Sequence, residues 1–172
     1  YWQGQTTYLR LLLSIMSAKE IYITNCIILS SLLIYLNILL FKKNKIIMGI
    51  FDLSLLLINI YIVPLCLEYY FVFILGVIFS IYIIKNINAP NEDKNLEKLF
   101  IVSGITTCFF DFLTCETITL TMPLVLYLML KIEAKEKINT RRITKYCLLW
   151  LTSYGIMYLL KWIINGIYFG IN

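Results

Sequence analysis

The chain has 172 residues, of which 60% are hydrophobic and only 15% are charged, and its formal net charge is +5 at pH 7. Soluble domains carry about 25% charged residues, so this composition excludes an ordinary soluble domain and indicates that lipid surrounds most of the surface. The absence of histidine excludes histidine metal sites, Cys–His nucleophile pairs and histidine proton shuttles. We therefore expect an all-α, polytopic membrane helical bundle, with residues 1–172 forming a single membrane domain.

The first segment, Tyr1–Met16, predicts an amphipathic helix that lies in the membrane interface. Polar residues recur at steps of three and four, leucines occupy the opposite side, and aromatic residues at the start suit the lipid headgroup zone. Ser17-Ala18-Lys19-Glu20 has the form of a capping box before an apolar run, so a new helix is expected there. The chain opens without a signal-peptide pattern, and we interpret it as part of a longer chain.

Apolar segments after this helix predict about six transmembrane helices, each needing about 20 residues to cross. The segments are Ile21–Phe41, Ile46–Val63, Tyr69–Ile84, a pair within Leu99–Leu130, and Tyr146–Leu160. Pro64 is expected to stop or kink the second of them, because proline removes a backbone hydrogen bond. Lys161-Trp162 is expected to interrupt the last one, before an apolar tail.

The Leu99–Leu130 region holds 32 residues, fewer than the roughly 40 that two full crossings need. Either two helices run into the flanking polar segments, over about 91–112 and 117–137, or the hairpin is re-entrant. We favour two full helices, because the polar extensions also contain helix-forming Glu and Lys.

The distribution of lysine and arginine predicts the orientation. If the basic loops 42–45, 85–98 and 131–145 are cytoplasmic, twelve of the 15 Lys and Arg residues lie inside, as the positive-inside rule favours. Residues 1–20 and 111–117 then lie on the outer side of a multi-pass protein of the cell membrane.

The tip of the Leu99–Leu130 hairpin carries the candidate catalytic residues, Asp111 and Glu116, because acids between apolar spans mark functional sites by default. Arg10, Lys161 and Thr114 are the candidate substrate-binding residues on the same side. Arginine matches phosphate oxygens in a bidentate way, and Lys161 is expected at the depth of Asp111. The alternatives stay open: a wet turn for the tip and snorkelling for the two cations.

Thr114, Thr117 and Thr121 recur at steps of three and four and predict a hydroxyl stripe along one helix. In lipid, such hydroxyls more often mediate helix contacts than bind substrate. The sequence has no Gly-rich phosphate loop and no metal-ligand spacing. We expect no metal, no cofactor and no nucleic-acid partner.

Three stretches together resemble a group of large, poorly characterised, multi-spanning bacterial membrane proteins. They are Tyr1-Trp2-Gln3-Gly4 with Leu9-Arg10-Leu11-Leu12, the run from Phe109 through Thr114 to Leu124, and Lys161-Trp162. Through that group the chain is similar to the GT-C class of membrane glycosyltransferases, which use polyprenyl-phosphate-linked sugars at the outer face. The chain departs from the pattern of this group at two places. The third residue of the opening motif is often His but is Gln3 here, and the segment after Thr114 usually carries a Pro but reads Cys115-Glu116-Thr117 here. The resemblance places the principal catalytic acid upstream of Tyr1 and leaves the membrane half of the site here.

Three interpretations of function follow. The first is the membrane part of a lipid-linked sugar transferase, with membrane lipid and a polyprenyl-phosphate sugar as its partners. The second is a transporter or lipid-handling protein, in which the short, Pro-interrupted hairpin moves. The third is a structural membrane subunit with no site of its own.

Overall fold

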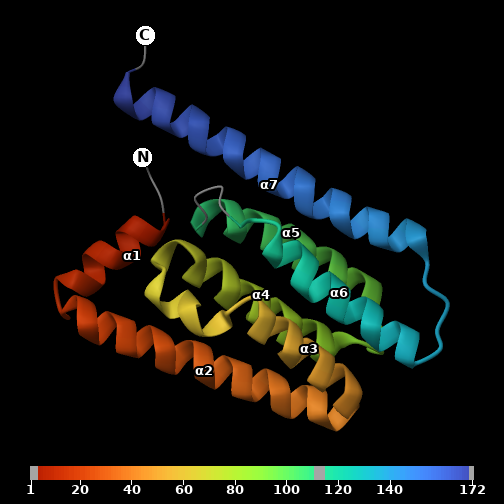
Figure 1. Cartoon of the computed structure of the whole chain (residues 1–172). Helices are drawn as coiled ribbons and strands as arrows, with labels where there is room; N and C mark the ends of the chain where they lie inside the picture. Colours follow the sequence, from red (N-terminus) through yellow and green to blue (C-terminus); the bar gives the residue numbers. More distant parts are fainter. Residues whose placement is uncertain (1–3, 111–114, 171–172) are drawn as a thin grey trace.

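We describe the protein from a computed structural model, in which residues 4–110 and 115–170 are described. All regular secondary structure in these residues is helical, which confirms the predicted all-α class. The helices are α1 (Gly4–Leu13), α2 (Ala18–Lys43), α3 (Lys45–Leu57), the 3-10 helix η1 (Ile60–Leu65), α4 (Leu67–Asn86), α5 (Glu92–Phe110), α6 (Ile118–Glu133) and α7 (Thr140–Phe169) (Figure 1).

Three of the described helices are long and apolar enough to cross a membrane: Ala18–Lys43, Tyr69–Asn86 and Thr140–Ile167. They contain the first, third and last of the apolar segments expected to span. The last differs from its expectation, because α7 continues through Lys161-Trp162 without a break and is capped by Gly170, whose φ is 56°. A single lysine does not interrupt a helix when its neighbours keep their backbone hydrogen bonds and its amine reaches polar partners.

The second expected span does not form one continuous helix. α3 ends at Leu57, Asn59 adopts a left-handed conformation with φ 58°, and Pro64 lies further on, inside η1. Thirteen residues of α3 rise about 20 Å, less than the hydrocarbon thickness of about 30 Å. The helix therefore breaks at an asparagine, a residue that tolerates this conformation, and not at the proline that the sequence marks.

The two hairpin helices extend into the flanking polar segments, as expected. α5 begins at Glu92 and α6 ends at Glu133, so the helices rise about 28 and 24 Å. Residues 111–114 of the connecting tip lie outside the described residues. Whether the pair crosses the membrane or re-enters stays a prediction.

The start of α2 confirms the predicted capping box. The Ser17 side chain accepts a hydrogen bond from the Glu20 backbone N–H at 3.4 Å, and the Glu20 carboxylate accepts one from the Ser17 backbone N–H at 2.8 Å. These bonds lower the pKa of the Glu20 carboxyl below its ordinary value. α1 is thus a separate helix, and it packs on α2, α4 and α5.

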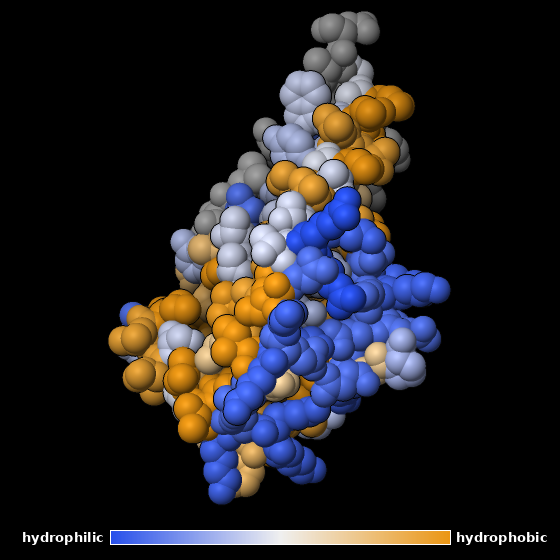
Figure 2. Space-filling model, turned by 90° about the vertical axis from the view of Figure 1, so that its right-hand side faces the viewer, coloured by the Kyte–Doolittle hydropathy of each residue, from blue (hydrophilic) through white to orange (hydrophobic). Residues whose placement is uncertain are grey.

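The helices lie side by side around α4, with α5 packed against α7 and α6 against α4. Fully buried apolar residues of α4, among them Val72 and Val77, fill the centre. The α2–α3 and α6–α7 connections lie at one end of the molecule, and α1 lies at the other (Figure 1). Hydrophilic side chains gather over the first of these ends, beside apolar side chains (Figure 2).

Candidate functional site

The structure describes three of the five predicted site residues, whereas Asp111 and Thr114 lie outside the described residues. Glu116 is half-buried just before α6, and its carbonyl accepts a hydrogen bond from the Thr119 hydroxyl at 2.9 Å. Arg10 is exposed in the last turn of α1. Lys161 is half-buried in α7.

Lys161 caps the C-terminal end of α5. Its Nζ donates hydrogen bonds to the carbonyl oxygens of Cys108 and, at 3.2 Å, of Phe109, and it lies 5.7 Å from the centre of the Phe109 ring. The last carbonyls of a helix lack partners within the helix, and a cation there is favoured by the helix dipole. Lys161 therefore fixes α7 to the C-terminal end of α5.

α1 meets the same end of α5 through an aromatic cluster. Gly4 packs against Phe109 and Phe110 so closely that a Cβ on Gly4 would lie 2.6 Å from a Phe109 ring carbon. The Phe110 ring stacks on Phe71 at 5.1 Å, and Tyr8 meets Phe71 edge-on at 4.8 Å. Phe109 thus touches both α1, which carries Arg10, and Lys161 of α7.

A polar cluster lies buried beneath α1, and the sequence analysis missed it. The Tyr8 hydroxyl donates to the Asn25 side-chain carbonyl at 3.3 Å. Asn25 and Tyr70 are fully buried, yet the Asn25 amide nitrogen and the Tyr70 hydroxyl have no hydrogen-bond partner in the described structure. Buried polar atoms without partners are rare, and each one costs about 1–3 kcal/mol. The sequence signal that could have indicated this cluster is Asn25 itself, a polar residue inside the uncharged run 21–41.

The interhelical hydroxyl contacts differ from the predicted stripe. Thr117 and Thr121 are exposed, whereas Thr119 is buried between α5, α6 and α7. Its hydroxyl bonds that of Thr107 at 2.7 Å and accepts from the Trp150 indole at 3.3 Å. The hydroxyl that joins the helices is therefore that of Thr119, which the predicted spacing skipped, and Thr114 lies outside the described residues.

Ion pairs join α5, α6 and α7 at the opposite end of the molecule. Lys131 lies between Glu92 at 3.1 Å and Glu136 at 2.7 Å, and the side chains of Lys131 and Glu92 are only 10% and 13% exposed. Further pairs on the surface join Arg142 to Asp93 at 3.1 Å and Lys145 to Glu97 at 2.6 Å. In the sequence these lysines and arginines predict only the orientation, and their carboxylate partners on the first turns of α5 are not predictable from it.

Two opposing effects act on the pKa of Lys131, which follows the apolar run of α6. Burial alone lowers it, because the charged form loses solvation. Hydrogen bonds to Glu136 and Glu92, together with their negative charges, outweigh that effect and raise the pKa above its ordinary value. Lys131 therefore stays protonated at neutral pH, and its charge compensates the buried Glu92.

Comparison of the chain with protein-family models, with curated proteins and with solved structures finds no match in any of the three. Within the described residues, no group of three or more Cys, Asp and Glu side chains is placed to hold a metal ion. The arrangement of α1, Phe109 and Lys161 and the polar cluster beneath α1 are therefore the basis for a functional proposal.

Proposed function

We propose that the chain is a multi-pass protein of the cell membrane that crosses the bilayer six times, with α3 and η1 together making the second crossing. The loops 42–45, 85–98 and 131–145 face the cytoplasm, and residues 1–20 and 111–117 lie outside. Charge asymmetry supports this orientation. The ion pairs from Lys131, Arg142 and Lys145 to carboxylates of α5 also support it, because they join two of these loops at one end of the molecule.

The activity we propose is transfer of a sugar from a polyprenyl-phosphate donor at the outer face, with this chain as the membrane part of the glycosyltransferase. Arg10 and Lys161 hold the lipid phosphate, and Thr114 supplies a hydroxyl to the same ligand. Asp111 or Glu116 orients the sugar or the acceptor hydroxyl. The resemblance to GT-C enzymes supplies the reaction class.

The observation that carries this proposal is the meeting of α1 and Lys161 at Phe109. It brings the first turn of α1 and Lys161 of α7 together at the C-terminal end of α5. The unpartnered Asn25 amide and Tyr70 hydroxyl add buried polar atoms beneath α1, close to this junction.

One observation favours the second candidate, a transporter or lipid-handling protein. The segment after Lys45 is broken by the left-handed Asn59 and continues as η1. Discontinuous helices at substrate sites are common in transporters. Uptake into proteoliposomes without a sugar donor, lost on replacing Asn59 by alanine, would support this candidate over the transferase.

The transferase proposal predicts that Arg10→Ala and Asp111→Asn abolish transfer from a polyprenyl-phosphate-linked labelled hexose while the amount of membrane protein stays normal. Transfer should fall at least about 100-fold, because each change removes a group that contacts the reacting ligand. Lys19→Ala is the control: Lys19 is an exposed cation near the same end and should leave transfer unchanged. Wild-type transfer rates in both test variants would overturn the proposal.

A further inference from the structure

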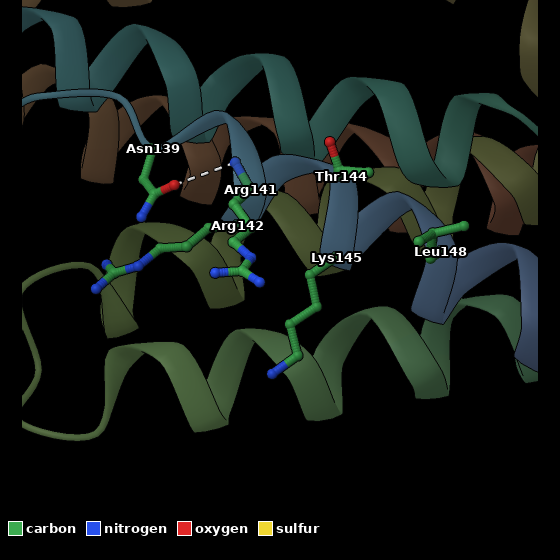
Figure 3. Close-up of a pocket in the computed structure, with 6 residues that line it drawn as sticks. All are labelled: Asn139, Arg141, Arg142, Thr144, Lys145 and Leu148. Atoms are coloured by element: carbon green, nitrogen blue, oxygen red, sulfur yellow. Dashed lines mark hydrogen bonds between the residues drawn. The ribbon is translucent and has the colours of Figure 1, made fainter.

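A basic groove lies at the start of α7, at the opposite end from the proposed transfer site. Its volume is about 530 Å³ (Figure 3). An adjoining hollow of about 550 Å³ shares Asn139, Arg141 and Arg142 with it. Small-ligand sites span about 300–1,000 Å³. The groove is lined by Asn139, Arg141, Arg142, Thr144, Lys145 and Leu148.

Cations in this groove outnumber the carboxylates that contact them. Arg142 and Lys145 are held by Asp93 and Glu97, while Arg141 is exposed and has no carboxylate partner among the described residues. The charged ends of all three cationic side chains extend to the same side of α7 (Figure 3). The groove therefore attracts an anion, with Arg141 available to bind it.

Side chains, and not the helix terminus, would hold such an anion. The backbone N–H of Arg141 is bonded to the Asn139 side chain at 3.1 Å, and the N–H groups of Arg142 and Ile143 are bonded to the Asn139 carbonyl. With these donors occupied, the guanidinium of Arg141 supplies the paired N–H groups that fit two phosphate oxygens.

An apolar stripe continues from the cations along the same side of α7. Leu148 lines the groove, three residues after Lys145 and seven after Arg141, and it is 54% exposed. Leu151, three residues further, is 58% exposed. Only 11% of the apolar window of α7 is buried, so the helix leaves a surface for hydrocarbon directly beyond the charges. A free anion would contact only the cations, whereas a lipid would contact the cations with its headgroup and the apolar stripe with its acyl chain.

We propose that this groove binds an anionic phospholipid, with its phosphate on Arg141 and Lys145 and an acyl chain along Leu148 and Leu151. The inference rests on the proposed insertion of α7 in a membrane and not on glycosyl transfer. Basic residues at the end of a membrane helix are suited to anionic headgroups, because charge attraction and apolar contact act together there.

The test counts lipids bound to the purified full chain by native mass spectrometry, in micelles containing phosphatidylglycerol or phosphatidylcholine. The wild-type chain should retain phosphatidylglycerol in preference to phosphatidylcholine. Arg141→Gln should weaken binding of phosphatidylglycerol about fivefold, because one cation near an anionic lipid surface contributes about that factor to affinity. Lys94→Gln removes an exposed cation on α5 outside the groove and should change binding less than twofold. Arg141→Lys should restore part of the loss, which separates a charge effect from misfolding.

Equal retention of the two lipids, or equal binding by Arg141→Gln and Lys94→Gln, would overturn the proposal. Leu148→Ser distinguishes a lipid from free phosphate: it should weaken binding of phosphatidylglycerol and leave competition by inorganic phosphate unchanged. Full displacement of the lipid by millimolar phosphate would assign the groove to a soluble anion instead. Arg10→Ala should keep lipid binding intact, so failure of this inference is distinct from failure of the transferase proposal.

Discussion

Alanine in place of Gly104 is expected to force α5 away from α7 and to destabilise the protein by about 3 kcal/mol, the upper end of the range for overpacking. A Cβ at Gly104 would lie 2.2 Å from the Ser153 hydroxyl, 2.5 Å from the Trp150 carbonyl oxygen and 3.0 Å from the Tyr154 backbone nitrogen. Two of these atoms belong to the α7 backbone, so a side-chain rotation does not relieve the overlap. SDS titration in mixed micelles measures the free energy of unfolding.

Gly155→Ala is the matched control, because Gly155 lies on α7 next to the same contact and a Cβ there meets nothing within 4 Å. Alanine is favoured over glycine inside a helix by about 1 kcal/mol, so this control should be slightly stabilising. The two substitutions are chemically identical and have opposite expected signs. Equal effects from both would show that α5 and α7 do not pack as closely as described.

The sequence predicts the apolar helices well because length and composition alone define them. The runs 21–41 and 69–84 contain no charge and no proline, and both lie within single helices. The 46–63 run is also apolar apart from Asp52, but its helix breaks at Asn59, and hydropathy carries no information about the left-handed conformation of one residue. Pro64, the obvious breaker, is accommodated in η1 after the helix has already ended.

The candidate site is less predictable, because its contacts join residues far apart in the chain. The sequence places Lys161 at the outer end of its helix, but it does not reveal that the amine bonds the last carbonyls of α5. It also does not single out Asn25, whose importance comes from burial beneath Tyr8. Charge counting assigned Lys131 to a loop, although the residue is buried and paired with Glu92 on another helix.

Methionine in place of Lys131 is expected to destabilise the protein by about 3 kcal/mol, because it leaves Glu92 buried without its cation. Lys131 is 8% exposed, and its Nζ lies 3.1 Å from Glu92. The estimate is at the lower end of the range for breaking a buried pair, because Glu136 on its other side is 47% exposed and reaches water. Lys145→Met is the control: Lys145 is 55% exposed, and its pair with Glu97 should contribute at most about 1 kcal/mol.

A second substitution separates the loss of charge compensation from the loss of packing. Glu92→Gln added to Lys131→Met removes the uncompensated carboxylate, so the double variant should regain more than half of the lost free energy of unfolding. If packing of the lysine chain were the cause, the double variant would be no more stable than Lys131→Met alone. Recovery would show that Lys131 stabilises the contact between α5 and α6 by neutralising Glu92, and that a lysine used here to predict the orientation also holds the two hairpin helices together.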